Sequence, residues 1–336
     1  MVLVTGGTGL VGSHLLYKLI SNGGKVRAIY RSEHKLENVK KVFSGYTDNY
    51  QPVFDAIEWF QADILDIPAL TEAFSETSYV YHCAAFVSFE PDKYQLLRKT
   101  NIEGTGNIVN LCISNNVKKL CYVSSIAAIG NQNISDKITE ESEWNPEENN
   151  NVYAITKYGA ELEVWRASQE GLDTVIVNPG VILGAGIWRY GSGSLFKKAH
   201  KGLKYYTSGS IGLVDVEDVV SIMIALTNSS IKNERYILIA ENWNYKDFLQ
   251  AMAKSVNSTI PKNLASLNLL QIGWRLDWLK HKLFGTRRML TKHLATSLSS
   301  QKKYSNSKIT EHLNYNFKPI KESITEVGEL YLKQAQ

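Results

Sequence analysis

A short apolar strand at the start of the chain runs directly into a glycine-rich turn. Val2 to Val4 are followed by the segment TGGTGLVG, residues 5–12, in which Gly6, Gly9 and Gly12 have the spacing of a dinucleotide-binding turn. Glycines at these positions let the backbone turn tightly and approach a pyrophosphate, and the helix predicted over residues 10–21 would direct its amide groups and positive dipole end at the phosphates. The strand, the turn and the amphipathic helix fit one βαβ unit.

Strand-like and helical segments alternate through the first half of the chain. This alternation predicts an α/β fold, a doubly wound parallel sheet of the Rossmann type with helices on both faces. The predicted strands are residues 25–30, 57–60, 79–83, 119–124 and 174–178, and the predicted helices lie near 34–43, 68–76, 92–115 and 151–170.

The alternation breaks after Gly180. A Gly-rich, aromatic stretch follows, then a helix near 216–227, a strand near 235–239 and a mostly helical remainder. We therefore expect a smaller, mostly helical substrate domain over the carboxyl edge of the sheet, where open α/β sheets bind ligands. The predicted nucleotide-binding domain comprises residues 1–183 plus about 213–244, and the substrate domain comprises about 184–212 plus 245–336.

Composition narrows the function classes. No run of eighteen apolar residues is present, and a strand that starts at residue 2 leaves no room for a signal peptide, so we expect a cytoplasmic protein. A net charge of +4 is too small to indicate a nucleic-acid partner. Cys83, Cys112 and Cys121 lie in apolar segments and the histidines lack metal-ligand spacing, so buried reduced thiols and no metal site are predicted.

The end of the second predicted strand bears on the choice of cofactor. NAD-specific units usually place an acid there to bind the ribose 2′-hydroxyl, but this strand ends in Tyr30-Arg31-Ser32. Arg31 suits a 2′-phosphate, which favours NADP(H), while Glu33 keeps NAD(H) possible. Asp63, after the third strand, can reach an adenine amino group.

A tyrosine and a lysine open the helix predicted over 151–170. Tyr153 and Lys157 are four residues apart, so both lie on one face of that helix. An ammonium beside a phenol stabilises the phenolate and makes tyrosine a usable acid or base near neutral pH. The pair Tyr304 and Lys308 has the same spacing, but it lies beyond the sheet pattern and is interpreted as structural.

Spaced motifs over residues 2–245 resemble the extended short-chain dehydrogenase/reductase family, also called the NAD-dependent epimerase/dehydratase family. The glycine turn is similar to its nucleotide turn, and Ala84-Ala85 to its cofactor-lining loop. The segments 100–105, 122–125 and 178–180 resemble its helix asparagine, its catalytic-serine strand and its nicotinamide-side loop.

The resemblance implies residue roles. Tyr153 would be the general acid/base, Lys157 would lower its pKa and hold the nicotinamide ribose, and Ser125 would hydrogen-bond the substrate oxygen. Asn101 would support a helix bend and a proton-relay water, and Ser124 matches the family's serine position less well than Ser125. The predicted cofactor-binding residues are Thr5, Gly6, Thr8, Gly9, Leu10, Val11, Gly12, Arg31, Asp63, Ile64, Ala84, Ala85, Phe86, Ser124, Tyr153, Lys157, Pro179, Gly180 and Val181.

Local residues narrow the reaction within that family. Ile126-Ala127-Ala128 follow the serine where the family's 4,6-dehydratases carry an Asp-Glu pair, so dehydration is not expected. The segments 26–31, 82–86 and 175–184 look like the dihydroflavonol-reductase and 3β-hydroxysteroid-dehydrogenase branch, which implies hydride transfer between NADP(H) and a secondary alcohol or ketone. An NAD-dependent sugar-nucleotide epimerase is the first alternative, supported by the cations Arg189, Lys197 and Lys198, and a non-catalytic NADP-binding sensor is the second.

Aromatic residues on the predicted loops favour an apolar small-molecule substrate. The residues predicted to contact it are Phe86, Phe89, Trp188 and Tyr190. Residues 264–284 are apolar early and basic late; we expect this helix to pack over the substrate cleft rather than to lie on a membrane surface. A homodimer built on the helices at 92–115 and 151–170 is a family-level expectation.

Overall fold

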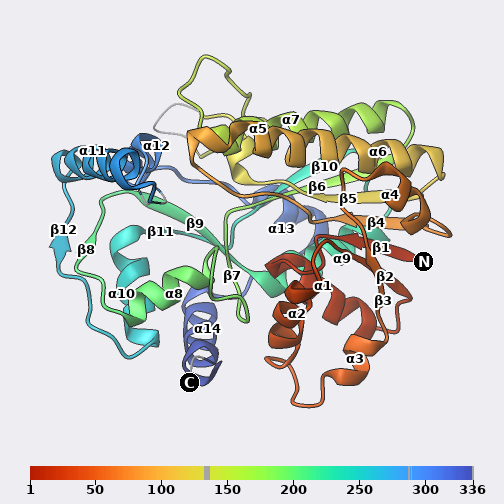
Figure 1. Ribbon diagram of the computed structural model, residues 1–336, viewed down its shortest axis with the longest axis horizontal. Helices are drawn as coiled ribbons and strands as arrows, with labels where there is room; N and C mark the ends of the chain where they lie inside the picture. The colour runs from red at the N-terminus through yellow and green to blue at the C-terminus, as the bar shows by residue number, and fades with distance from the viewer. Residues whose placement is uncertain (132–136, 287, 289, 335–336) are drawn as a thin grey trace.

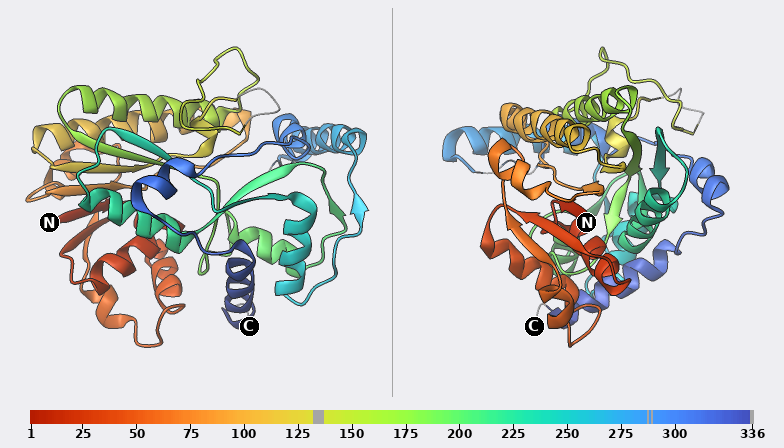
Figure 2. Two further views of the ribbon diagram at one scale, coloured as in Figure 1. Left: turned by 180° about the vertical axis from the view of Figure 1, so that it is seen from behind. Right: turned by 90° about the vertical axis from the view of Figure 1, so that its right-hand side faces the viewer.

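The computed structural model describes residues 1–131, 137–286, 288 and 290–334, and its centre is a parallel sheet of seven strands (Figures 1 and 2). The strand order is β10-β6-β5-β4-β1-β2-β3. The predicted α/β fold is confirmed, and each predicted strand is present to within one or two residues. The strands are β1 (Val2–Thr5), β2 (Val26–Tyr30), β3 (Glu58–Gln61), β4 (Tyr79–His82), β5 (Lys119–Val123), β6 (Asp173–Pro179) and β10 (Glu234–Leu238).

Helices cover both faces of this sheet. Successive side chains of a strand point to opposite faces, so Leu3 and Val4 of β1 enter two different core clusters. One layer contains α1 (Leu10–Ser21), α2 (Leu36–Phe43), α3 (Gln51–Asp55) and α9 (Val216–Asn228). The other contains α4 (Ile67–Ala73), α5 (Tyr94–Leu97), α6 (Gly104–Ser114) and α7 (Val152–Gln169), which lie above the sheet in Figure 1.

The strand order reverses between β1 and β4. From β1 the sheet continues through β2 to β3 on one side, and from β4 through β5 and β6 to β10 on the other. Ligands of open α/β sheets bind at such a reversal, beyond the carboxyl ends of the strands. The glycine turn follows β1, and the loop from Cys83 follows β4, so the two segments predicted to hold the cofactor meet at this point.

A second, smaller sheet joins the large one to the remainder of the chain. Its strands β7 (Val181–Leu183), β9 (Ser210–Asp215) and β11 (Glu241–Asn244) have the order β11-β9-β7, and β8 (Tyr205–Tyr206) pairs with β12 (Asn263–Leu264). The sequence indicated only a break over 184–212, because strands this short carry no clear periodicity. The helices α8 (Gly193–His200), α10 (Tyr245–Ser255) and α14 (Ile320–Gln334) contribute to one further core cluster with this sheet.

The chain then returns to the large sheet. Helix α13 (Ser307–Leu313) packs on β10, where Ile309 is fully buried in the core cluster beneath α9. Lys308 donates to Glu234 at 2.6 Å, and Tyr304 packs against the core cluster that contains Ile237 and Ile239. The second Tyr-Lys pair thus has the structural role expected for it, whereas residues 307–313 pack on the large domain although they were predicted within the small one.

Helices α11 (Leu267–Phe284) and α12 (Lys292–Ser297) stand at the end of the molecule opposite α4 (Figure 1). Their contacts form a separate small cluster around Ala265, Leu270 and Ala295. Within α11, all of whose residues are described, Leu270 alone is buried. The expectation that this helix packs its apolar face over the substrate cleft is not met, because most of its apolar side chains are exposed. No helix in the described part of the chain has both the length and the apolar content to span a bilayer.

Candidate active site

The glycine turn is shaped by close backbone contacts. Gly6 has a positive φ of 69°, and a Cβ on it would lie 2.5 Å from the Ala84 nitrogen. A Cβ on Gly12 would lie 2.3 Å from the Gly6 carbonyl oxygen, whereas one on Gly9 would meet nothing closer than 3.3 Å. Gly6 and Gly12 are thus required by the fold, and Gly9 keeps the outer side of the turn open. Helix α1 begins there without a side-chain cap on its first amides, so the turn fits a pyrophosphate.

Buried side chains hold this turn in place. The Thr5 hydroxyl lies 2.6 Å from His82 Nδ1 and accepts from the Ala84 amide at 3.3 Å. Ser13, which sequence reasoning missed, donates from α1 to the carbonyls of Gly7 and Gly9. Burial lowers the pKa of His82 to about 3, with Lys157 adding to the effect, so the imidazole is neutral. Thr5 therefore supports the cofactor turn from inside, where it is fully buried.

The residues predicted to meet the adenosine come together beyond β2 and β3. Arg31 Nη1 lies 3.6 Å from Asp63 Oδ2, and both side chains are a third or more exposed, so this ion pair contributes little stability. Lys35, in the helical turn Glu33–Lys35, joins them: burial and the nearby Arg31 guanidinium lower the pKa of its ammonium. Lys35 was not predicted from the sequence, although its position four residues after Arg31 was a signal that a second cation could lie near this site.

Asn101 lies in a π-helical segment, Arg98–Glu103, that joins α5 to α6. Its amide accepts from Phe86 N at 2.8 Å and donates to Phe86 O at 3.0 Å and to Thr156 Oγ1 at 3.1 Å. Such a widened turn is the helix irregularity expected at this asparagine. Asn101 thereby fixes the loop after β4 to α7, one turn from Tyr153.

Tyr153, Ser125 and Phe89 meet at the start of α7. The Ser125 hydroxyl lies close enough to the Tyr153 phenol to lower its pKa, and the Phe89 ring packs edge-on against the Tyr153 ring with centroids 5.5 Å apart. Burial raises the pKa of Tyr153 to about 12, and the Ser125 hydroxyl offsets only part of that rise. The expectation of a lowered phenol pKa therefore does not hold in this structure, and Tyr153 is a neutral phenol.

The Lys157 ammonium bonds to the sheet rather than to Tyr153. It donates to Tyr122 Oη at 2.6 Å and to the Val123 carbonyl at 2.8 Å. Burial lowers the pKa of Lys157 to about 7, although the Glu161 carboxylate opposes this shift. The two groups predicted to act together are brought to one helix face, with the ammonium deeper than the phenol.

A buried carboxylate that sequence reasoning missed lies one further turn along α7. Glu161 accepts from the Ser124 hydroxyl at 2.7 Å and from Asn178 Nδ2 at 3.0 Å, and it pairs with Arg235 at 3.1 Å. Asn178 also donates to the Ser125 carbonyl at 3.0 Å. Ser124 thus faces the interior, and Ser125 is the serine on the Tyr153 side. The sequence signal was present, since Glu161 follows Lys157 by four residues.

Two predicted substrate residues lie elsewhere. Trp188 packs against Phe196 and Tyr331 and donates to Gln334 at 2.9 Å, so it belongs to the core of the small domain. Tyr190 is exposed and accepts from Asn38 of α2 at 2.9 Å. The loop that carries both residues therefore contacts α2 and α14.

Three other predicted site residues lie in the segments that follow strands of the large sheet. Ile64 is buried and its carbonyl accepts from Asn107 of α6. Gly180 connects β6 to β7 so tightly that a Cβ would lie 2.2 Å from the Ile239 side chain. Ala85 is exposed in the loop that Phe86 anchors. Gly180 thus joins the two sheets, and Ala85 remains accessible beside the turn.

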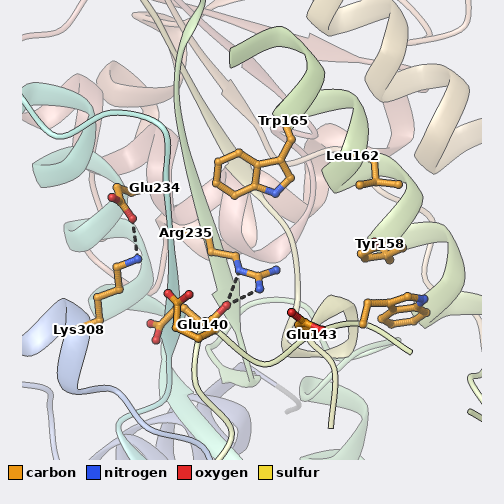
Figure 3. A pocket seen from close by; sticks show the side chains of 10 residues that line it. Glu140, Glu143, Tyr158, Leu162, Trp165, Glu234, Arg235 and Lys308 are labelled. Atoms are coloured by element: carbon orange, nitrogen blue, oxygen red, sulfur yellow. Dashed lines mark hydrogen bonds and ion pairs between the residues drawn. The ribbon is translucent and has the colours of Figure 1, made fainter. Parts of the chain in front are cut away.

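A cavity of about 530 Å³ is lined by Tyr158, Leu162 and Trp165 of α7 (Figure 3). Trp144 stacks on Tyr158 at its wall with centroids 4.5 Å apart, and Arg235 and Lys308 close it from β10 and α13. β10 is the edge strand, four places from β1 in the sheet, so this cavity is separate from the glycine turn.

A model of the NAD dependent epimerase/dehydratase family matches residues 2–240. The chain belongs to this family. The match covers the whole large sheet and the glycine turn, Ser125, Tyr153 and Lys157. A nicotinamide dinucleotide is the cofactor of this family, and the open, uncapped turn at Gly9 fits such a group. Family members are oxidoreductases, epimerases and dehydratases, so the family member described here is expected to be an enzyme.

Three relatives cover most of the chain. It is 27% identical to sterol demethylase protein B of Methylococcus capsulatus over 85% of its own length and 84% of that protein. It is 29% identical to a putative dihydroflavonol 4-reductase of Synechocystis (81% and 77%) and 30% identical to anthocyanidin reductase of Arabidopsis thaliana (82% and 89%).

Solved structures share the fold of this epimerase/dehydratase family member. The crystal structure of gox2253 superposes with a TM-score of 0.81 at 22% identity, covering 99% of this chain and 98% of that one. UDP-glucose 4-epimerase of Thermotoga maritima, with UDP-glucose, superposes with a TM-score of 0.76 at 20% identity, covering 100% and 99%.

Proposed function

We propose that the protein is an NADP(H)-dependent oxidoreductase that transfers hydride between the nicotinamide and the carbon of a secondary alcohol or ketone. The observation that carries this proposal is the cluster at the start of α7, where the Tyr153 phenol meets the Ser125 hydroxyl beside the Phe89 ring. The cofactor supplies or accepts the hydride. Tyr153 exchanges the proton with the substrate oxygen, and Ser125 hydrogen-bonds that oxygen.

The protonation state of Tyr153 favours carbonyl reduction. With a pKa raised by burial to about 12, the phenol carries its proton at neutral pH. A neutral phenol can donate that proton to a carbonyl oxygen as the oxygen gains negative charge, whereas alcohol oxidation would first require the phenolate. The reverse reaction should therefore accelerate as the pH rises toward 12.

Two cations support NADP(H) over NAD(H). Arg31 and Lys35 both follow β2, where the ribose 2′-position of a dinucleotide on this fold is placed, and the Arg31 charge adds to the effect of burial in lowering the pKa of Lys35. A 2′-phosphate would relieve the like-charge repulsion between them, and the arginine can bind it in a bidentate manner.

An apolar carbonyl compound fits the residues around Tyr153. Phe89 contacts the tyrosine ring, and the Phe86 backbone is clamped by Asn101, so aromatic side chains lie beside the reacting group. Relatives named as dihydroflavonol 4-reductase and anthocyanidin reductase suit the same class of substrate. Lys197 and Lys198, which favoured a sugar nucleotide, are exposed on α8, so they add no specific support for an epimerase.

Replacement of the phenol tests the reaction. Tyr153→Phe should lower NADPH-dependent reduction of aromatic ketones by about 10²–10⁴-fold while NADPH binding is retained. Tyr158→Phe, at the cavity lined by Trp144 and Trp165, is the matched control and should keep full activity. Full turnover by Tyr153→Phe would refute the assigned role, and NADPH binding without turnover by the wild type on ketones, aldehydes and sugar nucleotides would favour the sensor.

The cofactor preference has a separate test. Arg31→Ala should weaken NADPH binding by roughly ten- to a hundredfold and leave NADH binding unchanged, because only the 2′-phosphate loses a charged hydrogen-bond partner. Calorimetric titration of both dinucleotides measures this, and tighter binding of NADH than of NADPH by the wild type would contradict the assignment. The cytoplasmic location and the homodimer stay predictions.

A further inference from the structure

Helix α11 presents an apolar stripe to solvent. Leu269, Ile272, Leu276, Leu279 and Leu283 are between 44% and 65% exposed. Their spacing alternates between three and four residues, which places them within an arc of about 80° on the helix. Leu270, the buried residue of α11, lies about 140° from the centre of this arc. The stripe therefore points away from the contacts that attach α11 to the protein.

Cations border this stripe on both sides. Lys280 follows one edge, and Arg275 and Lys282 follow the other; all three are exposed. The acid of the helix, Asp277, instead lies toward the segment that leads to α12, where it accepts from the Leu290 amide at 3.1 Å and approaches Arg288 at 3.9 Å.

Further aromatic and apolar side chains are exposed on α11 and on the strands that precede it. Trp278 is 44% exposed and has the Lys282 ammonium 5.2 Å above its ring, but it lies about 140° from the centre of the stripe. Phe284 at the end of the helix is 74% exposed. Leu264 and Tyr205, on the paired strands β12 and β8, are also half exposed. Lysine and arginine at the border of an apolar stripe can bury their aliphatic stems beside lipid chains while their charged ends reach the headgroups.

We propose that α11 docks this protein on the surface of a bilayer that contains anionic phospholipids. The apolar stripe would enter the boundary between headgroups and acyl chains, and Arg275, Lys280 and Lys282 would contact the lipid phosphates. Charge complementarity favours this occupant over a second copy: a symmetric contact through the stripe would bring the bordering cations of both copies together. The proposal is independent of the reaction proposed for Tyr153.

Vesicle flotation of the full-length protein tests the docking. The wild type should bind vesicles of phosphatidylcholine with roughly one third phosphatidylglycerol, and bind pure phosphatidylcholine much more weakly. Ile272→Asn/Leu276→Asn should weaken binding to the mixed vesicles at least about tenfold. Lys280→Gln/Lys282→Gln should weaken it by roughly thirtyfold, a loss that high salt should reproduce in the wild type.

Two controls match these variants. Ile67→Asn changes an equally exposed side chain on α4, at the other end of the molecule, and Lys197→Gln/Lys198→Gln removes two exposed cations from α8. Both controls should bind like the wild type, and circular dichroism and thermal unfolding should show every variant folded.

Three results would overturn the proposal. The first is that the wild type fails to bind the mixed vesicles, and the second is that Ile272→Asn/Leu276→Asn binds them undiminished. The third is that the same variant converts a dimer to a monomer, or raises KM in the absence of vesicles, without loss of vesicle binding. The stripe would then be a contact between copies or a lid on the substrate cleft.

Discussion

Replacing the buried carboxylate of Glu161 should affect both stability and the active site. Its side chain is 1% exposed and bonds three partners: Ser124 directly after β5, Asn178 on β6 and Arg235 on the edge strand β10. Ser124 adjoins Ser125, and Asn178 holds the Ser125 carbonyl, so Glu161 is a positioning residue for the serine beside Tyr153.

The magnitude follows from what Glu161→Gln leaves behind. Removing one partner of a buried ion pair costs about 3–5 kcal/mol. Arg235 is about a fifth exposed and keeps its hydrogen bond to the Glu140 carbonyl, and a glutamine oxygen can still accept one bond. We therefore expect the lower end of that range, about 3 kcal/mol. The loss of the carboxylate should also lower the pKa of Lys157 below its value of about 7.

Urea unfolding at neutral pH and the pH profile of NADPH-dependent ketone reduction measure the two effects. If the Lys157 ammonium is required, the alkaline limb of the profile should move to lower pH in Glu161→Gln. Glu163→Gln is the matched control: Glu163 is about a third exposed and pairs with Arg166 one turn away at 3.1 Å, so its loss should cost under about 1 kcal/mol.

A double-mutant cycle with Arg235→Gln separates the ion pair from the rest of the network. A direct pair should show a coupling energy of about 1–3 kcal/mol. The reasoning is refuted if Glu161→Gln is no less stable than Glu163→Gln, or if its effect is simply additive with that of Arg235→Gln. An unchanged pH profile would remove the link to Lys157 while leaving the structural role intact.

Three further substitutions test other parts of the site. Gly12→Ala should destabilise the protein by about 1–3 kcal/mol and weaken NADPH binding more than tenfold, because its Cβ would lie 2.3 Å from a backbone oxygen. Thermal melts and NADPH titrations measure both effects, and Gly106→Ala on α6, where a methyl group has room, is the control. Asn101→Ala should cost about 2–3 kcal/mol in urea unfolding, since it frees both backbone groups of Phe86. Lys157→Met should be more stable than the wild type below about pH 7, where the wild-type fold must bury an ammonium. As the pH rises toward the ordinary lysine pKa of about 10.4, deprotonating this lysine costs less and the stability advantage of the variant should shrink by about 4 kcal/mol between pH 6 and pH 10, which unfolding at both pH values would measure.

The sequence predicted best those features that depend on local chemistry. The glycine turn can be recognised in the sequence because only residues without a Cβ fit between β1, α1 and Ala84. The parallel strands can be recognised because they are long enough to show their apolar character. The cluster of Ser125 and Tyr153 could also be expected. Ser125 follows the end of β5 and Tyr153 lies in the first turn of α7, so both are at the carboxyl edge of the sheet.

Features that depend on distant contacts were not predictable. Trp188 and Tyr190 were expected beside the nicotinamide, but their partners Gln334 and Asn38 are about 150 positions away in the chain. The pKa of Tyr153 has the same origin: the pairing with Lys157 suggested a lowered value, whereas burial by the surrounding loops raises it. Depth below the surface cannot be deduced from a four-residue spacing.

The four-residue spacing along α7 nevertheless connects this helix to the sheet at three positions, one more than the Tyr-Lys pair. Tyr153, Lys157 and Glu161 follow one another at every fourth residue. Lys157 donates to the Val123 carbonyl at the end of β5, Glu161 accepts from Asn178 of β6, and Tyr153 lies beside Ser125, which follows β5. Ser124, which donates its hydroxyl to Glu161, is itself held to β6, because its amide donates to the Val177 carbonyl at 2.8 Å. A shift of α7 along its axis would disturb all three contacts at once, so Tyr153 is held firmly to the sheet. Helix α11, in which one residue is buried, is attached to the protein much less firmly.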